Sequence, residues 1–264
     1  MTHSVAVVGA LGRMGERVRA ALDAEPSLAL GAALETPGHP RLGEKLEGGI
    51  SLSDDLLAAF AACPVAIDFS VPAASLACLR VAARAGSAYV TGTTGFEAEQ
   101  MEELRALAKR TPVLHAPNFS LAVNVLAWLV AEATRKLGPG YAAEIVELHH
   151  AAKRDAPSGT ALRLAEAIAA ARGESLEEHL VLERAGEIGA RPEHSIGVQT
   201  LRGGDSAGEH SVYFLGSGER LELHHRASSR DHFARGAVRA ATWLVGKPPG
   251  LYRVEHALGL APAP

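Results

Sequence analysis

The sequence contains little cysteine, few aromatic residues and no long apolar run. Only Cys63 and Cys78 are cysteines, and they form no metal-spaced pair, so we expect two reduced, buried thiols rather than a disulfide. The longest apolar stretch, 121–133, is interrupted by Asn124 and is too short to span a bilayer. The early glycines do not fit a signal peptide. These absences predict a cytoplasmic protein that does not associate with a membrane.

An excess of basic charge is also missing. There are 26 Lys and Arg residues against 30 Asp and Glu residues, a net charge of −4, and no block of like charge. A protein that binds the phosphate backbone of nucleic acids needs the opposite balance, so nucleic acid is not an expected partner. The hydrophobic content of 47% is enough to bury one large core or two smaller ones.

The order of the apolar runs predicts an α/β protein with two domains. In the first part, short apolar runs alternate with helical patterns, which predicts a parallel sheet covered on both faces. The predicted strands are 4–8, 28–34, 65–69, 88–91 and 113–115, and the predicted helices are 13–24, 54–61, 73–85 and 97–109.

The chain changes character after about residue 118. A helix is predicted over 121–137, followed by a strand at 142–150 and a helix at 157–171. Glycine-rich turns then separate strands predicted at 180–183, 195–202, 210–215 and 220–227, which indicates a mixed or antiparallel sheet in an α+β domain. A helix at 233–245 precedes a short tail, and the sequence leaves open whether this helix returns to the first domain.

A glycine-rich turn follows the first predicted strand and opens the first predicted helix. It reads Gly9-Ala10-Leu11-Gly12-Arg13-Met14-Gly15. Such a turn lets the backbone approach a pyrophosphate at the helix N-terminus, and Glu35, at the end of the second strand, is placed to bind a ribose. Together these features favour a dinucleotide site over a plain turn beside a surface glutamate.

The predicted cofactor is NADH, NADPH or both. Selectivity for NADPH usually needs an arginine near the 2′-phosphate, whereas Thr36 follows Glu35 here and the nearest cations are Arg13, His39 and Arg41. This pattern favours NADH. The segments 68–70 and 92–96 follow the third and fourth strands, where ligands of open α/β sheets bind, although each is equally explained as a plain turn.

The segment 147–160 carries the densest group of reactive side chains. Strand alternation places Glu147 and His149 on one face and His150 on the other. An imidazole can transfer protons near neutral pH, and Lys153 can bind a carboxylate beside it. The pair of histidines can also bind zinc, but no cysteine or carboxylate follows at ligand spacing, so we expect no metal.

A predicted helix start follows these histidines. Pro157 is expected at the first helical position, which leaves the amides of Ser158, Gly159 and Thr160 free to bind a carboxylate. A nucleophilic role for Ser158 is disfavoured because no G-x-S-x-G elbow surrounds it. A second pair, His224-His225, lacks the lysine and the helix start, and we expect it at an edge or in a cleft.

The segment 147–161 resembles, without a break, the signature E-x-H-H-x-x-K-x-D-A-P-S-G-T-A of the dihydrodipicolinate reductase family. The resemblance extends along nearly the whole chain through the strings GxxGRMG, DFS, GTTGF, APNFSLAVNV, IGVQTLRGGDSAGEH and GERLELHHRASSRDHFARGAVRAA. It implies a Rossmann-like cofactor domain formed by 1–120 and 230–264, and an α+β domain, 121–229, that binds substrate and assembles homotetramers.

The resemblance also implies a reaction and the residues that perform it. Nicotinamide delivers a hydride to 4-hydroxy-tetrahydrodipicolinate, with loss of water, in lysine and diaminopimelate biosynthesis. His149 is similar to the family's proton donor and Lys153 to the cation beside it, while the small dicarboxylate is implied to bind His150, Ser158, Gly159 and Thr160. The implied cofactor contacts are Gly9, Ala10, Leu11, Gly12, Arg13, Met14, Gly15, Glu35, Gly92, Thr93, Thr94, Ala116, Pro117, Asn118, Phe119 and Arg230.

Two departures from the family and two other functions bear on this interpretation. Thr36 and Val71 stand where NADPH-preferring relatives often carry a basic residue, which again favours NADH. A dehydrogenase that acts on another amino-acid-derived acid would use the same glycine turn, but this function would not explain the His-His-Lys segment. A regulator that senses the cofactor without catalysis would not need His149 and Lys153.

Overall fold

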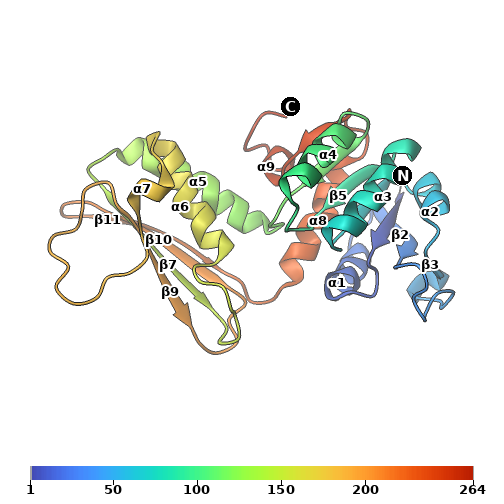
Figure 1. The fold of residues 1–264 in the computed structure, drawn as a ribbon, viewed down its shortest axis with the longest axis horizontal. Helices are drawn as coiled ribbons and strands as arrows, with labels where there is room; N and C mark the ends of the chain where they lie inside the picture. Colours follow the sequence, from blue (N-terminus) through green and yellow to red (C-terminus); the bar gives the residue numbers. More distant parts are fainter. Residues whose placement is uncertain (1, 264) are drawn as a thin grey trace. The chain divides into compact units, whose positions relative to one another are not determined.

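The computed structural model describes residues 2–263, which form two compact units (Figure 1). The first unit contains Met1–Leu121 together with Asp231–Pro264, and the second contains Ala122–Arg230. The C-terminal segment therefore belongs to the first unit. Each unit has its own sheet and its own apolar core.

The first unit is built on a parallel sheet of seven strands in the order β12-β6-β5-β4-β1-β2-β3. The strands are β1 (His3–Val8), β2 (Leu28–Leu34), β3 (Leu52–Ser53), β4 (Val65–Asp68), β5 (Ala88–Thr91), β6 (Pro112–His115) and β12 (Gly250–Tyr252). The chain builds outward from β1 in one direction and from β4 in the other. Ligands of such sheets bind at this switch point, beyond the carboxyl ends of the strands.

Helices cover both faces of this sheet. One face carries α1 (Arg13–Leu22), α8 (Asp231–Leu244) and α9 (Val254–Ala257), and the other carries α2 (Leu56–Ala62), α3 (Pro72–Ala85) and α4 (Ala98–Ala108). A short 3-10 turn, η1 (Glu47–Gly49), lies between β2 and β3. Pro72 starts α3, where its missing N–H costs nothing, and Gly86 ends it at a φ of 74°. Burial on both faces explains why these strands have continuous apolar runs.

The second unit is a mixed sheet of five strands in the order β11-β10-β7-β9-β8. The strands are β7 (Ala142–His149), β8 (Leu180–Val181), β9 (Ile196–Arg202), β10 (Glu209–Leu215) and β11 (Arg220–Arg226). The β7–β9 and β8–β9 pairs are parallel and the other two pairs are antiparallel. The predicted α/β fold with a second α+β domain is thereby confirmed.

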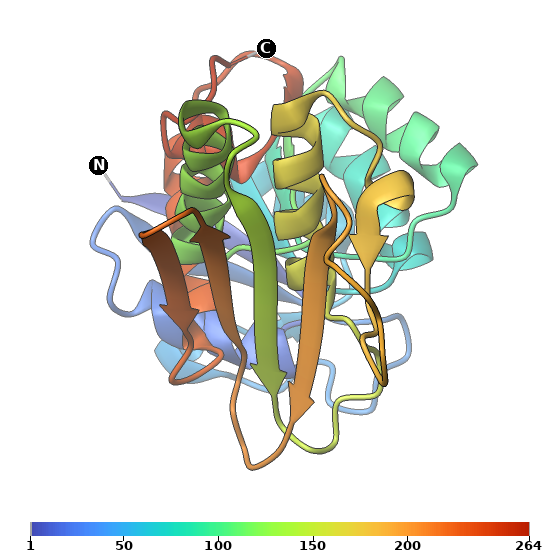
Figure 2. The same ribbon diagram turned by 90° about the vertical axis from the view of Figure 1, so that its left-hand side faces the viewer.

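Two helices, α5 (Leu121–Leu137) and α6 (Gly159–Arg172), pack on one face of this second sheet (Figure 2). Burial alternates along β7, so Ile145, Glu147 and His149 point towards the helices while Val146 and Leu148 lie on the other face. The short helix α7 (Leu176–His179) connects α6 to β8. The strand period of two thus places an ionisable pair, Glu147 and His149, on the buried face.

Several predicted boundaries were wrong. Helix α6 begins at Gly159 and not at Pro157, because Ser158 is its N-cap and the Ser158 hydroxyl accepts a hydrogen bond from Ala161 N. The predicted tail contains β12, which pairs with β6, and helix α9. The short elements β3, η1 and α7 were also missed, because two to four residues give no readable periodicity. Within residues 2–263, no helix is long and apolar enough to cross a membrane.

We expect neither cysteine to react with thiol reagents while the protein is folded. Both thiols are free and buried, and burial raises the pKa of Cys63 to about 11 and that of Cys78 to about 12. Because only the thiolate reacts, the reactive fraction at pH 8 is on the order of 1 in 1,000 or less. Titration with Ellman's reagent should detect no fast-reacting thiol in native protein and two in urea. Fast labelling of native protein would contradict this prediction.

Candidate functional site

The glycine turn lies at the switch point of the first sheet, between β1 and α1. Gly9 has a φ of 67°, and its carbonyl oxygen accepts a hydrogen bond from Gly12 N at 2.9 Å. Gly12 is the N-cap residue of α1. A Cβ on Gly15 would lie 2.0 Å from Gly9 O, so only glycine lets the helix pack this close to the turn. Gly12, Arg13 and the N-terminus of α1 thus leave backbone accessible to a pyrophosphate, which fits a dinucleotide.

The Glu35 side chain is hydrogen-bonded to the backbone of the glycine turn. Glu35 directly follows β2, and its carboxylate Oε1 accepts a hydrogen bond from Leu11 N at 2.9 Å. Ala10 N donates to Leu34 O, so the chain before Glu35 is tied to the same turn. Oε2 lies 3.3 Å from Thr36 N, which leaves this oxygen with acceptor capacity for a ribose hydroxyl.

Replacing Gly15 by alanine is expected to destabilise the protein by about 1 to 3 kcal/mol, because the new methyl group overlaps backbone atoms that cannot move independently. Gly12→Ala is the matched control, since its Cβ would lie 3.2 Å from Gly9 O and would need a much smaller shift. Urea unfolding should separate the two variants. Equal unfolding midpoints for Gly15→Ala and wild type would contradict close packing of Gly15 against the turn.

The loop 92–94 is anchored by a buried polar network at the ends of β4 and β5. The Thr91 and Thr93 hydroxyls donate to Asp68 Oδ2 at 3.0 and 3.1 Å, and His115 Nε2 donates to Thr93 O at 3.2 Å. A Cβ on Gly92 would lie 2.1 Å from the Phe69 ring. Gly92 and Thr93 therefore have packing roles of their own, and Thr94 follows them on the exposed side of the loop.

The loop 116–119 follows β6 at the same edge of the sheet. Ala116 N donates to Thr91 O, which ties this loop to β5. Phe119 is buried against Phe69, with ring centroids 5.6 Å apart, and its carbonyl lies where a Cβ on Gly236 would be. The Phe119 side chain thus belongs to the core, and Pro117 and Asn118 are the more exposed members of this predicted set.

In the second unit, Glu147 and His149 form a buried pair at the carboxyl end of β7. His149 Nδ1 lies 2.6 Å from Glu147 Oε2. Arg202, at the end of β9, donates to both carboxylate oxygens of Glu147, at 2.8 and 2.9 Å. Ser158 N and the Thr200 hydroxyl donate to Glu147 Oε1 at 3.0 and 3.2 Å. Glu147 has no exposed surface, and both of its carboxylate oxygens are hydrogen-bonded, which compensates for the burial of its charge.

These contacts set the charge of the pair. Burial pushes the pKa of Glu147 upwards, but the hydrogen bonds from Arg202, His149 and Ser158 N outweigh burial and hold this pKa below its ordinary value. Burial lowers the pKa of His149, against the opposing effect of Glu147, and Lys153 and Arg202 lower it further. The result is an ionised glutamate beside a histidine that exchanges a proton readily.

Lys153 and His150 lie in the turn that follows β7. Lys153 Nζ donates to both carboxylate oxygens of Asp155 at 2.8 Å, and this contact holds the pKa of Asp155 below its ordinary value. The Asp155 side chain is 63% exposed, so another carboxylate can replace it on Lys153. Arg230 donates to His150 Nε2 at 3.2 Å. Arg230 was predicted as a cofactor contact, and the structure places it beside a predicted substrate residue.

The start of α6 differs from the prediction of three free amides. Ser158 N is engaged by Glu147, and the buried Ser158 hydroxyl accepts from Ala161 N and contacts His210 Nε2 at 3.2 Å. Ser158 therefore supports the site from within. Gly159 and Thr160 form the first helical turn, which is where the positive end of the helix dipole lies.

Sequence reasoning missed three residues that complete this cluster. Arg202, Thr200 and His210 come from β9 and β10, the two strands that flank β7. The His210 ring lies 5.3 Å from the His149 ring, and burial lowers the pKa of His210 to about 3, so it is neutral. Arg202 and His210 occur in the family-like string 196–210, but only the strand order brings them to His149.

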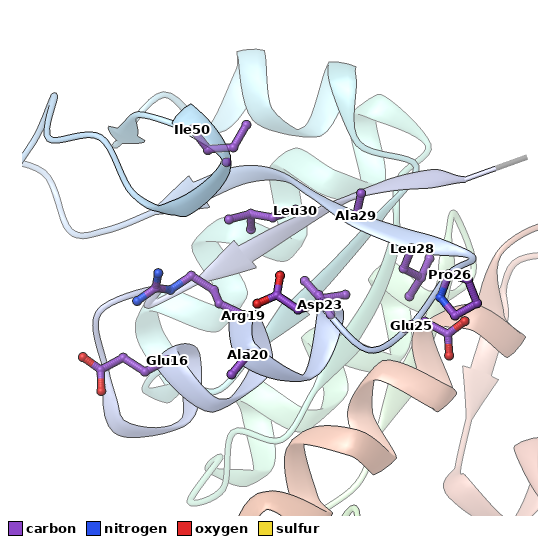
Figure 3. A pocket seen from close by; sticks show the side chains of 12 residues that line it. Glu16, Arg19, Ala20, Asp23, Glu25, Pro26, Leu28, Ala29, Leu30 and Ile50 are labelled. Carbon is purple, nitrogen blue, oxygen red and sulfur yellow. The ribbon is translucent and has the colours of Figure 1, made fainter.

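A groove of about 710 Å³ in the first unit is not the cofactor site. It runs along α1 and β2 (Figure 3), and Glu16, Asp23 and Glu25 contribute negative charge against Arg19 alone. It contains none of the predicted cofactor residues. Such a lining repels a diphosphate. Across the part of the chain that the structure describes, no group of three His, Cys, Asp or Glu side chains is arranged to hold a metal ion.

A parallel sheet with a glycine turn at its switch point, joined to a second unit with a buried carboxylate–histidine pair, defines a nicotinamide-dependent oxidoreductase. Residues 3–119 match the family model described as Dihydrodipicolinate reductase, N-terminus, and residues 122–258 match Dihydrodipicolinate reductase, C-terminus. The chain belongs to the dihydrodipicolinate reductase family.

Individual relatives agree with this family. The 4-hydroxy-tetrahydrodipicolinate reductase of Anaeromyxobacter dehalogenans strain 2CP-1 is 48% identical over 263 residues, covering 97% of each chain. That of Anaeromyxobacter sp. strain Fw109-5 is 49% identical over 98% of this chain and 99% of the relative. The structure of dipicolinate-bound dihydrodipicolinate reductase from Paenisporosarcina sp. TG-14 has a TM-score of 0.79 at 23% identity, covering 96% of this chain and 98% of that one, so it shows the same fold.

Proposed function

We propose that this chain reduces 4-hydroxy-tetrahydrodipicolinate to tetrahydrodipicolinate, with loss of water, in lysine and diaminopimelate biosynthesis. The observation that carries the proposal is the grouping of His149, Lys153 and the start of α6 around buried Glu147. Relatives that carry the name of this activity match almost the entire chain at 48 and 49% identity, which supports the same assignment.

The first unit is proposed to bind NADH or NADPH, which supplies the hydride. The amides at the start of α1, with Gly9, Gly12 and Gly15 giving close approach, would hold the pyrophosphate. Glu35 would accept hydrogen bonds from ribose hydroxyls through the carboxylate that already holds Leu11 N. The loops 92–94 and 116–119, at the carboxyl ends of β5 and β6, would contact the nicotinamide half.

The second unit is proposed to bind the dicarboxylate substrate. Lys153 would exchange Asp155 for a substrate carboxylate, and Gly159 and Thr160 would bind a carboxylate at the helix start. His150 would contribute a further polar contact. These groups supply positive potential where the chain as a whole is acidic, so substrate recognition depends on local charge.

His149 is the proposed proton donor. The hydride reaches the ring carbon that carries the hydroxyl group, and the hydroxyl group leaves as water after gaining one proton. Protonated His149 can supply a proton at the substrate, while Lys153 stabilises the developing negative charge.

A coupled assay tests the reaction. Aspartate semialdehyde and pyruvate are condensed by the preceding synthase, and the loss of reduced-nicotinamide absorbance is followed. Consumption that depends on the condensed substrate supports the proposal. If folded protein binds reduced nicotinamide without consuming it, the reductase proposal fails and a cofactor-sensing role replaces it. Turnover only with other semialdehydes or 2-oxo acids would instead indicate a different dehydrogenase.

The same assay decides the cofactor preference, which we propose to favour NADH. In the proposed role of Glu35, its carboxylate would face the adenosine ribose and would repel a 2′-phosphate there. Arg41, a nearby cation in sequence, is paired with Glu44 through two contacts of 2.6 Å. A higher kcat/KM with NADH is expected, and a higher value with NADPH would contradict the proposed preference.

We propose a homotetramer assembled through the face of the second sheet that the helices leave uncovered (Figure 2). Leu201 lies on this face opposite the half-buried Leu148 and is 52% exposed, and Leu215 lies on the same face opposite Ala142, at the other end of β7, and is 39% exposed. Apolar side chains in such a position favour association with a second copy. Sedimentation should give a tetramer that Leu201→Glu weakens, and a monomeric wild type would contradict the proposal. A cytoplasmic location and the absence of a nucleic-acid partner remain predictions.

A further inference from the structure

The proposed proton donor is held at one ring nitrogen by a carboxylate that can only accept hydrogen bonds. Glu147 is ionised, with Arg202 bound to both of its oxygens, and an ionised carboxylate has no hydrogen to give. His149 Nδ1, 2.6 Å from Glu147 Oε2, must therefore carry the hydrogen of that contact. The second nitrogen, Nε2, is then the atom that gains and loses a proton.

The surroundings of Nε2 agree with this assignment. Nε2 points at Gly208, where an ideal Cβ would lie 2.8 Å from it, and Gly208 has a φ of 134°. Any side chain at this position would occupy the space in front of the imidazole, so glycine keeps that space open. The other ring nitrogen, by contrast, faces the buried carboxylate and has no access to a substrate.

Arg202 adds a second effect. An ionised glutamate alone would stabilise the imidazolium strongly and hold its proton too tightly for transfer. The bidentate guanidinium offsets that charge, so Glu147 orients His149 without trapping its proton. The other charged or titratable groups that act on His149, His210 and Glu147 are Lys153, Arg202 and His225, and Asp155 faces this group through its contacts with Lys153 and Arg202.

We propose that Glu147 and Arg202 are positioning residues that fix His149 with its hydrogen on Nδ1 and present Nε2 as the proton-transferring atom. This inference rests on the proposed function, because it assigns the atom through which His149 acts. Gly208 is the third member of the arrangement, since it clears the approach to Nε2.

Nitrogen-15 NMR of histidine-labelled wild-type protein tests the inference without any turnover. At pH 8, long-range proton–nitrogen correlation should show His149 protonated at Nδ1 and unprotonated at Nε2, with His149→Gln used to assign the signal. Hydrogen on Nε2 in the neutral ring would overturn the inference. This tautomer with no reductase activity would leave the positioning intact and remove the proposed function, so the two failures are distinguishable.

Glu147→Gln provides the kinetic test. Arg202 should take the amide oxygen, which turns the amide NH2 towards His149 and reverses the tautomer. A reversed tautomer in a serine protease costs about 10⁴ in kcat, so we expect a loss of about 10²- to 10⁴-fold here. The substrate KM should change less than about threefold, because Lys153 and the start of α6 are intact, and the pH profile should shift.

Glu144→Gln is the matched control. Glu144 also lies on β7 and also binds guanidinium groups, those of Arg184 and Arg191, but on the opposite face of the strand. It should lose stability without a shifted pH profile. If Glu147→Gln does not fold, the double variant Glu147→Leu/Arg202→Met removes both charges together with the acceptor for Nδ1, which keeps the test available. A normal kcat and pH profile in either Glu147 variant would overturn the inference.

Discussion

Replacing His149 by glutamine is expected to lower kcat by about 10²- to 10⁴-fold while changing the substrate KM much less. Glutamine fills a similar volume and can still accept or donate a hydrogen bond near Glu147, but it cannot donate a proton at neutral pH. The interaction that is lost is made mainly in the transition state, which is why kcat falls more than affinity. Steady-state kinetics with the condensed substrate measure both constants.

The pH dependence gives an independent measure of the same residue. Because burial lowers the pKa of His149 from its ordinary value in the free protein, wild-type kcat/KM should fall with rising pH, and the fall should begin at lower pH than for an unperturbed histidine. A bound dianion raises that pKa, so kcat should fall only at higher pH. In His149→Gln, the fall of kcat/KM and the fall of kcat with rising pH should both disappear.

His179→Gln is a suitable control for the histidine variant. His179 lies in the same unit on α7, 3.8 Å from Glu174, and takes no part in the His149 cluster. It should retain normal turnover. Lys153→Ala is expected to raise KM and lower kcat together, because the lysine binds a carboxylate and also stabilises developing charge. Near-normal turnover in His149→Gln would remove that residue from its proposed role.

Arg202→Met should destabilise the protein by about 3 to 5 kcal/mol at pH 7, because it leaves the carboxylate of Glu147 buried without its main partner. The Arg202 side chain is 19% exposed and that of Glu147 is fully buried, so solvent screens the pair only weakly. Urea unfolding at several pH values measures the loss. Arg191→Met is the matched control, since Glu144 keeps Arg184 and should lose less.

The sign of the pH dependence follows from the pKa of Glu147. In the wild type this pKa lies below its unfolded value, so the pair stabilises the protein above about pH 4.3 and loses that contribution as the pH falls through the folded pKa. Without Arg202, burial dominates and raises the folded pKa. Protonation of Glu147 in the variant then removes the buried charge, and the difference in unfolding free energy between wild type and variant should narrow as the pH falls through this raised pKa. A pH-independent difference would contradict this account.

The sequence by itself determined the local elements of this protein. The predicted strand 28–34 and helix 121–137 match β2 and α5 in both boundaries, because apolar periodicity and the Gly-Pro-Gly stop are short-range signals. It also determined that Glu147 and His149 share a face, since alternation along a strand has a period of two. The glycine turn and Glu35 could also be identified from the sequence, because the strand, the turn and the helix that form this motif follow one another in the chain.

Only the tertiary structure decided which distant segments meet. Strands β9 and β10 follow each other in the sequence, yet β7 lies between them in the sheet, and this order brings Arg202 to Glu147, 55 residues away. The return of α8 and β12 to the first unit was likewise not readable from local pattern. Strand pairing depends on the burial of whole faces and on register between remote segments, and a local pattern contains neither. The sequence therefore contains Arg202 and His210, but it does not predict that they lie beside Glu147 and His149.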